Sequence, residues 1–144
     1  MLLTTVVNAY ATDNIINLDE QGNISSTGIT ISTNGKVIIG VYMDEETGDQ
    51  QVYKYTEDGG RIVLGNLGGY QSYINGLSAD GAVIIGRSFT ADYEEHAFKY
   101  TDSTGMVDLG TLGGDTSYAR NVSADGSTVI GWSSTGIYLS LIHI

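Results

Sequence analysis

The 144-residue sequence has no cysteine, no proline and few basic residues. The absence of cysteine excludes disulfides, thiolate metal sites and a cysteine nucleophile. Six Lys and Arg stand against 17 Asp and Glu, and the resulting net charge of -11 would repel phosphate backbones and anionic lipid surfaces. No apolar run approaches the ~20 residues that a membrane-spanning helix needs. Nucleic acid is therefore not expected as a partner, and no transmembrane segment is predicted in this sequence.

The residues that are abundant indicate a turn-rich β protein. Twenty Gly and ten Tyr occur in a chain whose residues are 41% hydrophobic. That apolar fraction is enough for a packed core.

A four-residue pattern occurs three times along the chain. The copies are Ser32-Thr33-Asn34-Gly35, Ser78-Ala79-Asp80-Gly81 and Ser123-Ala124-Asp125-Gly126, separated by steps of 46 and 45 residues. A period of this length is typical of a repeat protein, in which each unit buries its apolar face only against a neighbouring unit.

Each repeat predicts four short antiparallel strands. A strand precedes the recurrent turn, and the strand after it, Val37–Gly40 or Val83–Gly86, is apolar on both faces, which indicates cover from two sides. A third strand is predicted at residues 51–56 and 96–101, and a weaker fourth strand at 61–64 and 106–109. Four strands per ~45 residues is typical of a β-propeller blade. The fold class is therefore predicted to be all-β, a β-propeller fragment, with a parallel β-solenoid as the alternative.

The repeat period divides the chain into segments. Two nearly full blades are expected at 28–73 and 74–118, with a truncated blade at 119–138 and a degenerate partial repeat at 12–27. Residues 1–11 end in Ala9-Tyr10-Ala11 and are interpreted as the remnant of an export signal, with the first strand of a partial blade as the alternative. Residues 139–144 correspond to a translated sequencing-library adapter, and they are expected to be an artefact rather than part of the natural protein.

The recurrent pattern is interpreted as a structural turn. Asn-Gly and Asp-Gly favour type I′ hairpins, in which both central residues have positive φ. Because the uncharged Asn34 replaces Asp80 and Asp125, the shared property is turn geometry rather than acid–base chemistry. The predicted structural turn residues are Asn34, Gly35, Asp80, Gly81, Asp125 and Gly126.

Other candidate residues have structural interpretations that are favoured over functional ones. His96 is expected to bond to a strand neighbour, because Gln51 occupies the same repeat position. The acidic loops at 44–49 and 92–95 are expected to be solvated; they have oxygen ligands for Ca²⁺ but no EF-hand spacing. No catalytic residue, metal or cofactor is predicted.

The aromatic residues fall into two expected groups. Strand alternation places four of them in the core or between blades: Tyr53, Tyr55, Phe98 and Tyr100. Four tyrosines are predicted to lie in loops, where ligand contact stays open: Tyr70, Tyr73, Tyr93 and Tyr118.

One set of motifs resembles a known family. The resemblance rests on three motifs in a fixed order: the tripeptide His96-Ala97-Phe98, the linker Leu109-Gly110-Thr111-Leu112-Gly113-Gly114 and the turn at Ser123–Gly126. This order is similar to that of the bacterial HAF family of extracellular repeats. The resemblance implies an exported or surface-displayed protein, often an autotransporter passenger, with propeller-like repeats and no agreed catalytic residues.

The resulting hypothesis is a non-catalytic exported or cell-surface module that mediates interaction or adhesion through an unknown glycan or protein ligand. The alternatives are a propeller enzyme acting on glycans and a structural spacer.

Overall fold

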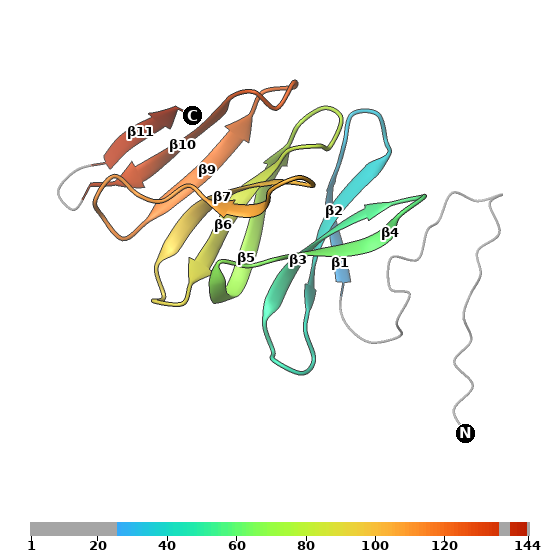
Figure 1. Cartoon of the computed structure of the whole chain (residues 1–144), viewed down its shortest axis with the longest axis horizontal. Helices are drawn as coiled ribbons and strands as arrows, with labels where there is room; N and C mark the ends of the chain where they lie inside the picture. Colours follow the sequence, from blue (N-terminus) through green and yellow to red (C-terminus); the bar gives the residue numbers. More distant parts are fainter. Residues whose placement is uncertain (1–25, 136–138, 144) are drawn as a thin grey trace.

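The computed structural model describes residues 26–135 and 139–143, which form β-strands joined by turns and loops (Figure 1). Residues 1–25, which include the expected signal remnant and most of the expected partial repeat, lie outside this description. Within the described ranges, no helix is long and apolar enough to cross a membrane. The strands are β1 (Ser26–Ile31), β2 (Val37–Met43), β3 (Gln50–Thr56), β4 (Gly60–Gly65), β5 (Gly68–Leu77), β6 (Ile84–Thr90), β7 (Glu95–Thr101), β8 (Gly105–Asp108), β9 (Ser117–Val122), β10 (Val129–Ser134) and β11 (Leu139–His143).

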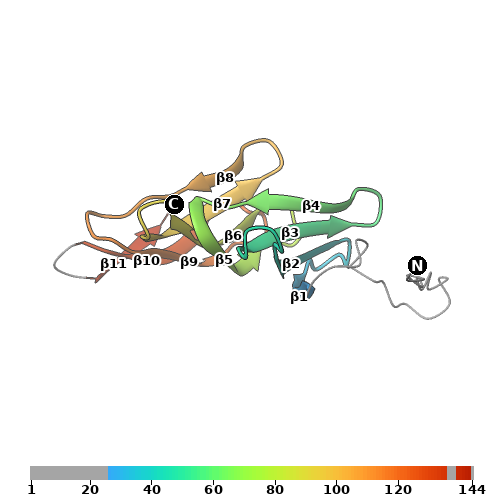
Figure 2. The same ribbon diagram turned by 90° about the horizontal axis from the view of Figure 1, so that it is seen from below.

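The strands form successive antiparallel units. β1 to β4 pair in chain order, β5 to β8 repeat the arrangement, and β9 to β11 form a third unit with three described strands (Figures 1 and 2). The first two units are joined by one parallel pair, Gln50 with Gln71. The prediction of four-stranded antiparallel units is confirmed, and the parallel solenoid is excluded because consecutive strands within each unit run in opposite directions.

Two units begin earlier than the sequence suggested. β5 starts at Gly68 and β9 at Ser117, whereas the expected boundaries were 74 and 119. The early part of β5 reads Gly-Gly-Tyr-Gln-Ser-Tyr, which lacks the alternating apolar pattern that marks a strand in the sequence. Residues 139–143, expected to be an adapter artefact, pair with β10 through their backbone as β11.

The apolar core lies between units rather than within them. One cluster joins the first and second units: Val37, Ile39, Val52, Leu64, Ile84, Phe98 and Tyr100. A second cluster joins the second and third units: Ile85, Ala97, Ala119 and Val129. The consecutive residues Ile84 and Ile85 therefore face different neighbours and are both fully buried, as predicted for a strand covered on two sides.

A glycine in the second strand of each of the first two units makes room for an aromatic ring. A Cβ on Gly40 would lie 2.4 Å from the Tyr53 ring, and one on Gly86 would lie 2.7 Å from the Phe98 ring. Both rings are fully buried, which confirms the prediction that these two aromatic residues belong to the core. Tyr100 is also buried, whereas Tyr55 is half-buried.

Candidate functional site

The three recurrent turns lie next to one another at one edge of the molecule (Figure 1). In each turn the serine carbonyl accepts a hydrogen bond from the glycine N–H three residues later, at 2.8 to 3.0 Å. Only the glycine is left-handed, with φ of +72° at Gly35, +75° at Gly81 and +72° at Gly126. The expected type I′ geometry is therefore wrong, because it needs positive φ at the preceding Asn or Asp as well. The turns are type I turns followed by a left-handed glycine.

The serine of each turn bonds to the Asn or Asp side chain two residues later. Ser78 Oγ donates to Asp80 Oδ1 at 2.6 Å and accepts from the Val83 N–H at 3.0 Å, while Asp80 Oδ1 also accepts from the Ala82 N–H at 3.0 Å. The hydrogen bond from Ser78 lowers the pKa of Asp80. In the third turn, bonds from Ser123 and then Ser127 lower the pKa of Asp125 to about 2. These carboxylates stay ionised and bonded within their own turns, which makes them poor proton donors.

The turns also bond to one another across the units. The Thr33 N–H donates to the Ala79 carbonyl at 3.0 Å, and the Ala79 N–H donates to the Ala124 carbonyl at 2.9 Å. Gly81 lies against Val37 of the preceding unit, and Gly126 lies against Val83. The recurrent motif thus forms a hydrogen-bonded ladder that holds neighbouring units together.

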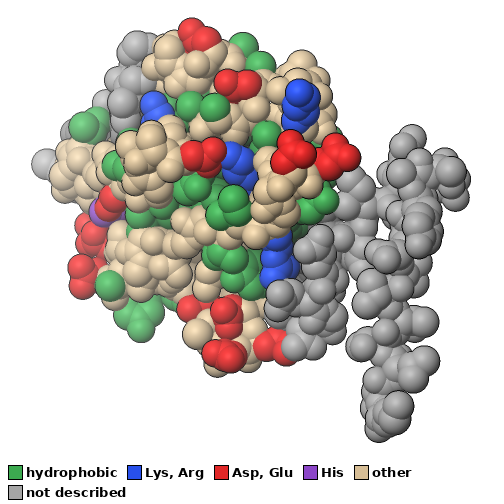
Figure 3. Space-filling model, turned by 45° about the vertical axis from the view of Figure 1, so that its right-hand side comes forward, with side chains coloured by type: hydrophobic (Ala, Val, Ile, Leu, Met, Phe, Trp, Pro, Cys, Tyr) green, Lys and Arg blue, Asp and Glu red, His purple; other side chains and the backbone are tan. Residues whose placement is uncertain are grey.

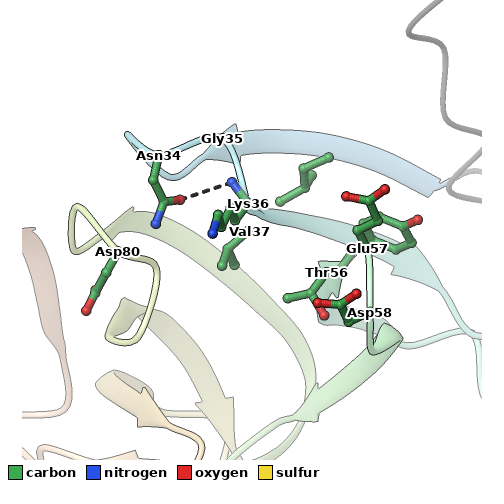
Figure 4. Close-up of a pocket in the computed structure, with 10 residues that line it drawn as sticks. Asn34, Gly35, Lys36, Val37, Thr56, Glu57, Asp58 and Asp80 are labelled. Carbon is green, nitrogen blue, oxygen red and sulfur yellow. Dashed lines mark hydrogen bonds between the residues drawn. The ribbon is translucent and has the colours of Figure 1, made fainter. Parts of the chain in front are cut away.

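A cleft of about 500 Å³ lies beside the first two turns (Figure 4). Asn34 and Lys36 form one side, and the other side is formed by Thr56 at the end of β3 and by Glu57 and Asp58 in the β3–β4 turn. The remaining lining residues are Gly35, Val37, Ile38, Tyr55 and Asp80. The Asn34 and Thr56 side chains accept hydrogen bonds from backbone N–H groups of their own turns. These lining side chains therefore stabilise turns.

Each residue of the His96-Ala97-Phe98 motif has a structural contact. The His96 Nδ1 atom lies 2.8 Å from Asp108 Oδ2 on β8, and its Nε2 lies 3.3 Å from Glu94 Oε2. The Ala97 N–H donates to Ser117 Oγ of the third unit at 2.8 Å, and Phe98 fills the space above Gly86. The motif therefore ties β7 to its neighbours on both sides.

The acidic loop between β2 and β3 is closed by its own hydrogen bonds. Asp44 Oδ1 accepts from the N–H groups of Glu46 and Thr47 at 2.9 and 3.1 Å, and the Gly48 N–H donates to the Asp44 carbonyl at 2.8 Å. In the part of the chain that the structure describes, no group of three or more His, Asp or Glu side chains is arranged to hold a metal ion.

An arginine–aromatic stack links the second and third units, and the sequence did not predict it. Arg87 Cζ lies 4.5 Å from the centre of the Tyr73 ring and 4.7 Å from that of Tyr118. Tyr118 packs edge-on against Trp132 at 4.3 Å and donates a hydrogen bond to Glu95 at 2.5 Å. Burial and this bond to Glu95 raise the pKa of Tyr118. Tyr73 and Tyr118 lie in β5 and β9, so the prediction that they lie in loops is wrong.

Buried serines anchor the glycine-rich linkers between units. Ser88 Oγ accepts from the Leu67 N–H at 3.1 Å and lies 2.9 Å from Ser72 Oγ. In the next unit, Ser133 Oγ accepts from the Leu112 N–H at 2.8 Å. Four such serines are completely buried: Ser72, Ser88, Ser117 and Ser133. The sequence did contain a signal for these serines. Ser72 and Ser117 are 45 residues apart, as are Ser88 and Ser133, so both pairs occupy equivalent repeat positions.

Three aromatic side chains contact one another where the start of β5 meets the end of β6 and the β6–β7 loop. These segments lie at the edge opposite the recurrent turns (Figure 1). Tyr70 stacks on Phe89 with centroids 4.8 Å apart and ring planes 20° apart, and Tyr93 lies 6.2 Å from Tyr70 at 46°. Tyr93 is 77% exposed and Tyr70 is 45% exposed. We call Tyr70, Phe89 and Tyr93 the aromatic triad. Tyr93 lies in the β6–β7 loop, as predicted, whereas Tyr70 lies in β5.

The backbone of Tyr93 is strained. Its φ of +64° makes it the one described residue other than glycine in the left-handed region, where a side chain costs about 1–2 kcal/mol. Gly48 occupies the same place in the first unit, with φ of +75°. A side chain that is mostly exposed gains little from burial, so packing does not offset this strain.

The triad does not belong to the framework that the units share. The positions equivalent to Phe89 hold Met43 and Ser134, and the position equivalent to Tyr70 in the third unit holds Asp115. The shared positions, by contrast, carry the turns, the linkers and the core. Strained and exposed residues of this kind are concentrated at functional sites, so the triad is the strongest candidate site among the described residues.

No family model matches the sequence, and no curated protein matches it. Among solved structures, the chain is similar to a protein assigned as TolB from Agrobacterium tumefaciens, at 21% identity and a TM-score of 0.60 over 79% of this chain and 40% of that one. It also matches TolB from Acinetobacter baumannii, at 19% identity and a TM-score of 0.49 over 85% of this chain and 33% of that one. The chain therefore spans less than half the length of either protein. TolB is a β-propeller protein, and the first similarity shows that the units of this chain are blades of a β-propeller fragment.

Proposed function

We propose that this chain is part of a non-catalytic interaction module of an exported or cell-surface protein, and that a partner binds at the aromatic triad. The observation that carries the proposal is the exposed Tyr93, which is held in a strained conformation at a position where the first blade has Gly48. The propeller fold supports it, because such folds present loops at the edges of packed blades. The resemblance to the HAF family supports an exported location.

The carboxylates that recur in the blades do not favour a glycan-cleaving enzyme. Such an enzyme needs two carboxyl groups facing one substrate, one of them with a raised pKa. Asp80 and Asp125 instead bond to their own serines, and both pKa values are lowered. These groups are suited to holding turns rather than to proton transfer.

The proposal is tested by selecting ligands on the intact 144-residue chain. A random dodecapeptide display library and an oligosaccharide array are each probed with the wild-type chain and with the double variant Tyr70→Ala/Tyr93→Gly. We expect binders whose affinity falls about tenfold or more in the double variant, as for a binding hot spot. Thermal unfolding followed by circular dichroism checks that the variant is folded.

The matched control is Leu112→Ala, which removes another large apolar side chain that is 50% exposed. We expect it to leave the affinity of every selected ligand unchanged. The proposal is refuted if no peptide or oligosaccharide binder distinguishes the wild-type chain from the double variant; the structural-spacer hypothesis would then be favoured.

A further inference from the structure

A pair of tyrosines in the first blade holds an arginine side chain. The rings of Tyr42 and Tyr53 lie 6.5 Å apart with their planes at 58°. Arg61 Cζ lies 4.8 Å from the centre of the Tyr42 ring and 5.8 Å from that of Tyr53. A guanidinium group is attracted to the electron-rich face of an aromatic ring, and its planar shape allows it to stack there.

The same contact recurs between the second and third blades. Arg87 lies between Tyr73 and Tyr118, within 4.7 Å of both ring centres. Pairs of tyrosines that accept a guanidinium are therefore a recurring packing element of this chain.

The tyrosine pair in the triad has similar geometry but no cation of its own. The Tyr70 and Tyr93 rings lie 6.2 Å apart at 46°, close to the 6.5 Å and 58° of the pair that holds Arg61. All six Lys and Arg side chains of the sequence fall within the described residues, and none of them is placed over either ring. Stacking on Phe89 fixes the Tyr70 ring in position. The described residues therefore leave this tyrosine pair without a cation, unlike the pair that holds Arg61.

The charges around the triad favour a cationic occupant. Asp92 and Glu94 flank Tyr93 in the chain, Asp92 is exposed, and the Glu94 side chain is 43% exposed. Acidic side chains are also spread over the face shown in Figure 3. With a net charge of -11, the protein attracts positively charged partners and repels anionic ones.

We propose that the aromatic triad binds an arginine side chain of a protein partner, an inference that rests on the proposed function above. The guanidinium lies against the rings of Tyr70 and Tyr93, and the carboxylates of Asp92 and Glu94 supply charge complementarity. Arginine is favoured over lysine because the ammonium group is more strongly hydrated and has no planar face to stack. The strained Tyr93 backbone holds its ring ready for this contact before the partner arrives.

The test uses defined peptides and the tyrosine ring signals of the intact chain in nuclear magnetic resonance spectra. The probes are Gly/Ser dodecapeptides that carry one central arginine, one citrulline or one lysine; citrulline has nearly the shape of arginine but no charge. We expect the arginine peptide to shift the Tyr70 and Tyr93 ring signals and to bind about fivefold more tightly than the citrulline peptide. Tyr93→Gly and, separately, Tyr70→Ala should abolish the effect, and Leu112→Ala should preserve it.

Two results would overturn the assignment. One is equal affinity for the arginine and citrulline peptides, and the other is an arginine-induced shift that persists unchanged in Tyr93→Gly. An oligosaccharide such as chitohexaose that shifts these ring signals when the arginine peptide does not would identify a glycan site instead. In that case the display and array experiments would still find triad-dependent ligands, so the proposed function would stand while the arginine assignment would fall.

Discussion

Gly81 in the second blade lies directly against Val37 in the first. A Cβ placed on Gly81 would approach Val37 Cβ to 2.6 Å, closer than side chains pack. The equivalent glycine of the first turn, Gly35, has the same left-handed conformation, but among the described residues no atom lies within 4 Å of such a Cβ. The two positions therefore separate the cost of backbone conformation from the cost of crowding between blades.

We expect Gly35→Ala to lower the free energy of unfolding by about 1 kcal/mol, the cost of a left-handed alanine. Gly81→Ala should cost about 1–3 kcal/mol more, because the added methyl group also overpacks the contact with Val37. Urea unfolding of both variants measures the difference. An equal decrease in the free energy of unfolding for the two variants would show that the contact between the blades accommodates the added methyl group without strain.

The buried hydroxyl of Ser88 should contribute more than an ordinary surface serine. Ser88→Ala leaves the Leu67 N–H without its acceptor and Ser72 without its partner, and an unsatisfied buried group costs about 1–3 kcal/mol. The control, Ser103→Ala in the exposed β7–β8 turn, should stay within about 0.5 kcal/mol of the wild type. The same urea experiment measures both, and similar values for the two variants would contradict a linker anchored by Ser88.

The repeat and the strand order were predictable because they depend on local patterns that recur. The apolar run that contains Ile84 and Ile85 predicted cover on both faces, and both residues are fully buried. The turn type was mispredicted because Asp-Gly alone favours one geometry, whereas Ser78 bonds to Asp80 and stabilises another.

Contacts between side chains of neighbouring blades could not be predicted from the sequence patterns. Arg87 meets Tyr118 only because two blades stack, and periodicity does not report which side chains meet across that interface. The triad had a weak signal: aligning the blades places Tyr93 opposite Gly48. Its meaning depends on the positive φ at both positions.

The acid sensitivity of the turns should depend on Asp125 and Asp80. The pKa of Asp125 is lowered from 3.8 to about 2 in the folded chain, so its stabilising contribution is present above the unfolded value and is lost as the pH falls toward the folded value. Asp80→Asn/Asp125→Asn should therefore flatten the decline of melting temperature below about pH 4. Asn34→Asp should steepen it, because Ser32 and the Lys36 N–H already bond to this side chain. Parallel acid profiles for all three proteins would contradict this role.

Arg87 should stabilise the interface between the second and third blades through its shape as well as its charge. Lysine keeps the charge but cannot stack between Tyr73 and Tyr118, so Arg87→Lys should lower the free energy of unfolding by about 1 kcal/mol. Arg120→Lys, at an exposed position, is the matched control and should change it by less than about 0.5 kcal/mol.

A second measurement isolates the charge of Arg87. This charge lowers the pKa of Tyr118, against the larger raising effects of burial and Glu95. Arg87→Met removes the charge and keeps an apolar side chain, so the pKa of Tyr118 should rise further, whereas Arg87→Lys should largely preserve it. Titration of the Tyr118 ring signal in alkaline solution reads this directly. Two results together would contradict this role: Arg87→Lys as stable as the wild type, and an unchanged Tyr118 titration in Arg87→Met. The guanidinium between these rings would then contribute neither to stability nor to the pKa of Tyr118, and the stacking of arginine on tyrosine would no longer be supported as a packing element of this chain.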